Sequence, residues 1–175
     1  MLLVSPYLCA NTEYKTVDWV ELMPAEDLEA LMNPPDFLDA IEEGSEQDSI
    51  ESIKQLTEED ENAKRFFEAL KSAEVIPEFD DKNIRIPGFI VPLVSDEEQR
   101  VTEFFVVPYF GACLHLPPPP PNQIIYAKSI EGVELTTLSM PFWFEGNITI
   151  ESHNNDLGAS AYGMAAHNVV PYDTF

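Results

Sequence analysis

The sequence has 175 residues, of which 45% are hydrophobic and 11% aromatic, so it carries enough apolar material to fold. Asp and Glu number 32 against 9 Lys and Arg, and the net charge of −23 argues against binding to nucleic acid or anionic lipid. No stretch approaches the roughly 20 apolar residues of a membrane-spanning helix. We therefore expect residues 1–175 to form a single domain without a transmembrane segment.

The first ten residues are apolar but lack the basic leader of a complete signal peptide. Cys9 follows Pro6, Tyr7 and Leu8, which match a lipid-attachment sequence poorly. Cys9 and Cys113 are the two cysteines, so a single disulfide between them is one alternative for the chain. The cysteine count leaves the cellular compartment open.

The region up to residue 80 is acidic and has helical patterns. Fifteen carboxylates and a single basic residue, Lys54, fall between Glu21 and Asn62. Apolar residues at helical spacing over residues 28–32 and 37–41 predict two short amphipathic helices.

A third and stronger helix is predicted from Thr57, as its N-cap, to about Ser72. Its apolar stripe includes Phe66, Phe67 and Leu70. Because such a stripe must be buried against another element, we expect it to pack on a sheet.

From residue 83 the apolar period changes from helical to alternating, which predicts strands. Residues 84–93 and 101–107 read as a hairpin with a turn over residues 95–100. Shorter strands are predicted over residues 124–127, 142–144, 147–151 and 161–170, with a turn at Glu145-Gly146. Five or six short strands favour an α+β fold: a small antiparallel OB-like β-barrel over residues 83–172, with the acidic helical segment of residues 1–80 packed on it.

The most unusual stretch is VVPYFGACLHLPPPPPNQ, at residues 106–123. If Cys113-Leu114-His115 is extended, its thiol and imidazole project to the same side, and these groups suit zinc and copper better than magnesium or calcium, with zinc the leading ion. A structural zinc ion usually has four protein ligands, so others must come from elsewhere. Among His153, Met164 and His167, we rank His167 first because a barrel could place the terminal strand beside the second one.

Three alternatives to a metal site remain. A lone Cys and His are often core residues, and a Cys and His pair can also perform thiol chemistry when a third group orients them. Alternatively, a stiff polyproline rod and nearby aromatic rings can dock a partner protein. The candidate partner-binding residues are Tyr109, Phe110, Pro117, Pro118, Pro119, Pro120, Pro121 and Trp143.

Five segments of the chain carry long, specific motifs. They are residues 19–24 (WVELMP), 85–93 (RIPGFIVPL), 101–104 (VTEF), 108–123 (PYFGACLHLPPPPPNQ) and 161–164 (AYGM). Together they resemble the bacterial family labelled domain of unknown function 3299 (DUF3299), over nearly the whole chain.

The resemblance implies a secreted, periplasmic bacterial protein, often a lipoprotein whose full-length precursor is lipid-anchored. Such proteins are commonly encoded beside components of ABC-type transporters and sometimes beside histidine-rich metal-binding proteins. We therefore expect a non-enzymatic accessory protein of a transport system that binds zinc through Cys113 and His115, with His167 as a third ligand. The alternative is a structural module that docks a transporter subunit without metal, and the third option is a thiol enzyme.

Overall fold

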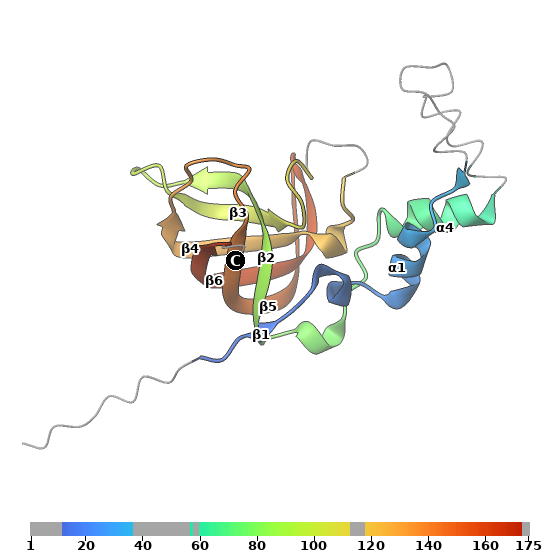
Figure 1. Cartoon of the computed structure of the whole chain (residues 1–175), viewed down its shortest axis with the longest axis horizontal. Coiled ribbons are helices and arrows are strands. Elements are labelled where there is room, and N and C mark those ends of the chain that lie inside the picture. Colours follow the sequence, from blue (N-terminus) through green and yellow to red (C-terminus); the bar gives the residue numbers. More distant parts are fainter. Residues whose placement is uncertain (1–11, 37–56, 58–59, 113–117, 173–175) are drawn as a thin grey trace, which may run out of the picture.

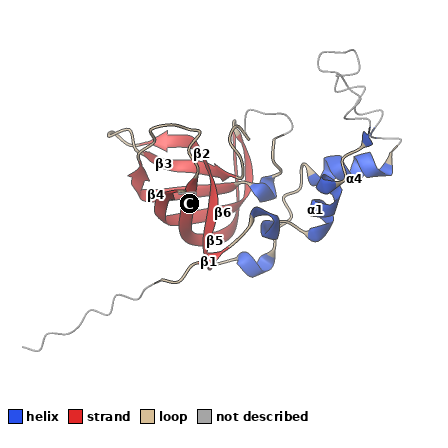
Figure 2. Cartoon of the chain, in the orientation of Figure 1, coloured by secondary structure: helices blue, strands red, loops and turns tan. Residues whose placement is uncertain are grey.

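The computed structural model describes residues 12–36, 57, 60–112 and 118–172. Five strands close into a barrel, and a short sixth strand and two helices lie beside it (Figure 1). The barrel strands are β2 (Lys82–Ser95), β3 (Val101–Val107), β4 (Ile125–Val133), β5 (Phe142–Asn155) and β6 (Gly158–Pro171). Figure 2 shows that the strands form one body and the helices lie to one side of it. The predicted α+β architecture with a small barrel is confirmed.

The barrel closes because β2 is long enough to pair with two strands. Its first half pairs with β5 and its second half with β3, and the remaining neighbours are β3 with β4, β4 with β6, and β6 with β5. All these pairs are antiparallel except β4 and β6, which run parallel from Ile125↔Tyr162 to Ser129↔Ala166. The sheet is therefore mixed, rather than purely antiparallel as the sequence predicted.

The predicted turn at Glu145-Gly146 is wrong, because β5 runs continuously through both residues. A Cβ atom on Gly146 would lie 2.3 Å from the backbone oxygen of Ala165 on β6. The glycine therefore allows two strands to approach closely, a role that an isolated glycine in a strand often has. The register shifts at the same place, where β6 has one extra residue, His167, and forms a β-bulge.

Two hydrophobic clusters lie on opposite faces of the barrel wall. Adjacent residues of β3 illustrate the division, because Phe104 belongs to the main core and Phe105 to a second cluster. The main core is the barrel interior, and its largest buried side chains include Ile84, Phe144 and Tyr162. The second cluster contains the buried residues Phe105, Val107, Ala112, Ile124 and Tyr126.

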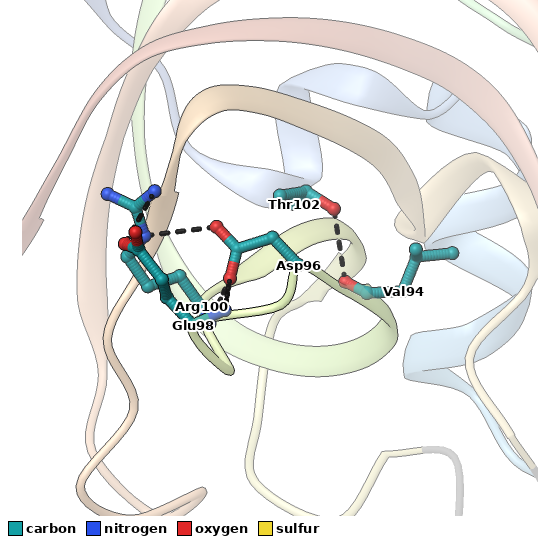
Figure 3. Close-up of polar contacts among 5 residues, drawn as sticks. All are labelled: Val94, Asp96, Glu98, Arg100 and Thr102. Atoms are coloured by element: carbon teal, nitrogen blue, oxygen red, sulfur yellow. Dashed lines mark hydrogen bonds and ion pairs between the residues drawn. The ribbon is translucent and has the colours of Figure 1, made fainter.

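The turn predicted over residues 95–100 joins β2 to β3 in the structure, and the side chain of Asp96 holds it (Figure 3). Its Oδ1 accepts hydrogen bonds from the backbone N–H groups of Glu98 (3.0 Å) and Arg100 (2.8 Å), and its Oδ2 accepts one from Arg100 Nε (3.0 Å). These donors, the backbone N–H of Arg100 first, hold the pKa of Asp96 below its ordinary value.

The chain enters the barrel through β1 (Lys15–Thr16), which pairs in parallel with β2, and the 3₁₀ helix η1 (Trp19–Leu22). Two helices follow, α1 (Ala25–Met32) and α4 (Glu61–Ala69). The helix predicted over residues 37–41 lies outside the described residues.

The N-cap of α4 is Asp60 rather than Thr57. Its Oδ1 accepts from the backbone N–H groups of Asn62 (2.8 Å) and Ala63 (3.3 Å). α4 packs against α1, and the two lie side by side next to the barrel, so its apolar stripe does not lie on the sheet as expected (Figure 1). Neither helix is long and apolar enough to cross a membrane, and the same holds throughout the part of the chain that the structure describes.

Candidate functional site

The candidate site is the connection between β3 and β4, residues 108–124. It leaves and re-enters the barrel at one end, because Val106 at the end of β3 pairs with Ile125 at the start of β4. Cys113, His115 and Pro117 lie outside the described residues, whereas both flanks of the connection are described. The described part of the candidate site therefore consists of two flanks, residues 108–112 and 118–124.

The first flank presents two aromatic rings beside a buried anchor. Tyr109 and Phe110 are 44% and 52% exposed, whereas Ala112 is fully buried in the second cluster. The backbone N–H of Ala112 donates to the carbonyl of Tyr109 at 3.3 Å, and Gly111 between them has a φ of 78°. A left-handed glycine suits such a tight turn. The turn buries Ala112 while leaving both rings at the surface.

The second flank carries the prolines. Pro118 is exposed, Pro119 and Pro120 are buried, and Pro121 begins the 3₁₀ helix η3 (Pro121–Gln123). Pro120 has φ −63° and ψ 156°, the polyproline II conformation predicted for this run. Because Pro119 and Pro120 pack against the protein, Pro118 and the half-buried Pro121 are the accessible part of the described prolines.

Asn122 and Gln123 anchor this flank, and sequence reasoning did not single them out. The Asn122 side-chain nitrogen donates to Asp27 Oδ2 at 3.1 Å and to the carbonyl of Glu74 at 3.0 Å. Gln123 Nε2 donates to the carbonyl of Trp19 at 2.8 Å. Both side chains are buried, so their bonds join the connection firmly to the N-terminal region. The sequence feature that could have indicated Asn122 and Gln123 is their position, as two polar residues directly after the proline run.

Tyr162 on β6 is fully buried in the core. Its hydroxyl donates to the carbonyl of Leu22 at 2.9 Å and accepts from the backbone N–H of Ile76 at 2.8 Å. Burial raises the pKa of this hydroxyl, and the Ile76 bond opposes the change in part. Tyr162 thus joins the barrel to two N-terminal segments.

His167 lies at the bulge of β6, five residues beyond Tyr162, which pairs with Ile125 at the start of β4. At about 3.3 Å per residue, roughly 17 Å of strand separates it from the barrel end that carries the candidate site. Its Nδ1 forms a 3.0 Å hydrogen bond with the hydroxyl of Tyr14. The structure therefore does not bring His167 to the flanks of the Cys113 motif.

His153, by contrast, belongs to the same packed group as the first flank. Its ring stacks on Tyr126, with centroids 3.7 Å apart and an interplanar angle of 3°, and meets Phe105 edge-on at 6.2 Å. Tyr126 and Phe105 share the second cluster with Ala112, the residue before Cys113. Within the described ranges, no group of three or more His, Cys, Asp or Glu side chains could hold a metal ion.

The hydroxyl end of the Tyr126 side chain lies in a polar environment. Its hydroxyl donates to Glu103, and Lys128 Nζ lies 3.7 Å from the Glu103 carboxylate. Burial, and then the bond to Glu103, raise the pKa of Tyr126.

Trp143, the remaining candidate partner-binding residue, lies opposite Pro87 on β2. Its ring contacts the guanidinium of Arg85 at 4.3 Å and the ring of Tyr172 at 4.9 Å. Two residues along β2 from Pro87, Phe89 contacts Phe110, with centroids 6.2 Å apart. Trp143 and the first flank are therefore linked through β2, although Trp143 has stacking partners of its own.

Comparison with known families gives one decisive match. The model for "Protein of unknown function (DUF3299)" matches residues 19–171. The chain belongs to the DUF3299 family. It is also similar to the crystal structure of a DUF3299 family protein from Pseudomonas aeruginosa PAO1, with 33% identity, a TM-score of 0.65, and coverage of 94% of this chain and 99% of that one. The comparison with curated proteins finds no match.

Proposed function

We propose that this DUF3299 protein is a non-enzymatic accessory protein of a transport system in the bacterial periplasm. It docks a transporter subunit through the β3–β4 connection. The observation that carries this proposal is the exposure of the adjacent rings of Tyr109 and Phe110 beside the fully buried Ala112. The periplasmic setting and the ABC-type partner rest on the family resemblance.

Exposed aromatic rings on an anchored segment favour protein recognition for two reasons. Aromatic side chains contribute much of the binding energy at interfaces, because they remove large areas from water with few rotatable bonds. A segment that is already fixed also loses less conformational freedom when a partner binds. Asn122, Gln123 and Ala112 supply that fixation through buried contacts on both flanks.

The test measures, by biolayer interferometry, binding to the periplasmic region of an ABC-type permease, the class of partner that the family resemblance implies. We expect Tyr109→Ser/Phe110→Ser to weaken binding at least tenfold, since each lost ring costs about 1 kcal/mol or more. Met32→Ser is the matched control, because Met32 is 72% exposed at the end of α1 and its loss should change little. Equal binding by the double variant and wild type would refute the docking role.

A second candidate function is zinc binding at Cys113 and His115. One observation favours it: His153 packs in the cluster that contains Ala112, the neighbour of Cys113. We propose His153 as the third ligand in place of His167, which lies at the other end of β6. Imidazole and thiolate ligands together suit zinc.

Equilibrium zinc titration of the reduced protein tests this second candidate. We expect one zinc ion per chain, with affinity lost in Cys113→Ser and His115→Ala, reduced in His153→Gln and unchanged in His167→Gln. No stoichiometric binding by the wild type would remove the metal site and leave the docking role standing. Loss of affinity in His167→Gln alone would restore the original choice of ligand.

A further inference from the structure

β6 extends beyond its pairing with β4. The parallel pairs end at Ser129↔Ala166, whereas β4 remains beside β3, with an irregularity in the register before its last residue, Val133, pairs with Val101. β6 continues to Pro171, and on its other side residues 168–171 remain paired with β5. In the portions of the chain that the structure describes, no strand pairs with residues 167–171 on the side that β4 has left.

The bulge at His167 accounts for this separation. An extra residue in one strand bends that strand and increases its local twist. The extra residue of β6 falls directly after Ala166, the last residue paired with β4. The bond between His167 Nδ1 and the Tyr14 hydroxyl holds the bulged residue in place. The free edge is therefore built into the register of the barrel.

A groove of about 600 Å³ lies between this edge, the end of β4 and the connection that leads to β5. Its apolar lining comes from Val133, Met140, Phe142 and Val169. Alternate residues of a strand direct their backbone N–H and C=O groups to opposite sides, so the groups of about half of residues 167–171 face the groove, and Pro171 among them has no N–H to donate. The groove thus combines an apolar lining with backbone acceptors and fewer backbone donors.

The charge of the groove selects its occupant. Glu131 and Glu134 line it, and no Lys or Arg is among its lining residues in the described structure. The whole chain carries a net charge of −23. A ligand with positive side chains is therefore attracted, and one with negative side chains is repelled.

We propose that this groove binds an extended, basic segment of another protein, which adds to the edge of β6 as a strand. Its backbone would hydrogen-bond with residues 167–171, and its alternate side chains would fill the apolar groove or face Glu131 and Glu134. Binding by strand addition draws affinity from backbone hydrogen bonds and specificity from alternate side chains. This surface is separate from Tyr109 and Phe110, which lie at the barrel end where β3 and β4 are joined.

The probe is a fluorescein-labelled eight-residue peptide of alternating valine and lysine, with binding followed by fluorescence anisotropy. Three control peptides accompany it. One carries glutamate in place of lysine. The other two keep the sequence but carry N-methyl groups on every second backbone nitrogen, beginning at the first position in one register and at the second position in the other. We expect the basic peptide to bind and the acidic one not to bind. One of the N-methyl registers should lose binding, because it blocks the backbone donors that face β6.

On the protein side, Glu131→Gln/Glu134→Gln should weaken binding about tenfold, as expected for two lost ion pairs. Glu26→Gln/Glu29→Gln makes the same charge change on α1 and should stay within about twofold of wild type. Tyr109→Ser/Phe110→Ser should bind the peptide normally, which separates this proposal from the docking role. The proposal would be overturned if the basic peptide did not bind at concentrations up to about 1 mM, or if the two N-methylated peptides bound equally well. It would also be overturned if the Glu131/Glu134 and Glu26/Glu29 double variants lost the same affinity for the peptide.

Discussion

The buried side-chain nitrogen of Asn122 donates to the carboxylate of Asp27 at 3.1 Å, across 95 positions of sequence. The same nitrogen donates to the carbonyl of Glu74 at 3.0 Å. One amide thus joins three parts of the chain: the β3–β4 connection, α1 and the segment after α4. The candidate site and the helices are therefore mechanically coupled.

Replacing Asn122 should destabilise the protein. Asn122→Ala leaves the Asp27 carboxylate and the Glu74 carbonyl without this donor, and we expect a loss of about 2 kcal/mol in the free energy of unfolding. Asn122→Asp should cost more, because it places a second carboxylate in a buried position beside Asp27. Urea unfolding followed by circular dichroism measures both.

Asn33 provides the control for this prediction. Its side chain also donates to a backbone carbonyl, that of Glu29 at 2.7 Å, but the residue is exposed. Asn33→Ala should therefore cost well under 1 kcal/mol. If Asn122→Ala costs no more than Asn33→Ala, the buried amide does not have the coupling role assigned to it.

Removing the Tyr162 hydroxyl should lower stability in a pH-dependent way. Tyr162→Phe leaves the Leu22 carbonyl and the Ile76 N–H unpaired, which we expect to cost about 1–3 kcal/mol at pH 7. The folded pKa of Tyr162 is raised, so its neutral form stabilises the fold fully below the unfolded pKa of about 10, and this contribution is lost as the pH rises further. Chemical unfolding at pH 7 and pH 11 should show the gap between the two proteins closing. A gap that widens with pH would contradict the raised pKa.

A methyl group at Gly146 should be poorly tolerated. Its Cβ would lie 2.3 Å from the backbone oxygen of Ala165, so Gly146→Ala must push β5 and β6 apart. We expect a loss of about 2–4 kcal/mol. Gly163→Ala is the comparison, because its Cβ meets side-chain rather than backbone atoms, namely Thr149 Oγ1 at 3.0 Å and Glu151 Oε2 at 3.2 Å. Thermal unfolding should therefore give a clearly lower Tm for Gly146→Ala than for Gly163→Ala.

The β2–β3 turn should show an acid dependence. The folded pKa of Asp96 is lowered, so its carboxylate stabilises the turn above the unfolded pKa of about 4, and that contribution disappears as the pH falls through the folded value. Asp96→Ala should lower the urea midpoint at pH 7, and the difference from wild type should shrink below about pH 4. Glu97→Ala, an exposed neighbour in the same turn, serves as the control. A difference that persists at pH 2 would mean that the charge is not what holds the turn.

The alternating apolar pattern was enough to predict β2 and β3, because inward residues such as Ile84, Ile86 and Phe104 must occupy one face of a strand. It failed at Gly146, where the sequence signal of a turn and that of a close strand approach are the same. Asp60 and Thr57 are both good N-cap residues, and the choice between them depends on where the helix begins in three dimensions.

The site was harder to predict than the fold. The partners of Asn122 lie 48 and 95 positions away, and no local pattern indicates a contact over such a distance. His167 and His153 look alike in sequence, yet a bulge places the first at one end of β6 and a stack on Tyr126 places the second beside the β3–β4 connection. Register and bulges, rather than residue type, decide which histidine lies near the motif.

The position of β6 in the barrel has a consequence for synthesis of the chain. β6 follows the other four barrel strands in the sequence and so leaves the ribosome after them, yet it fills the place between β4 and β5, pairing with β4 over residues 162–166 and with β5 from Gly158 to Pro171. Until it emerges, both neighbours carry an unpaired edge, which is the state most open to association with other chains. Barrel closure must therefore follow translation of residues 158–171, and a nascent chain stalled before Gly158 should be prone to aggregate or to bind chaperones.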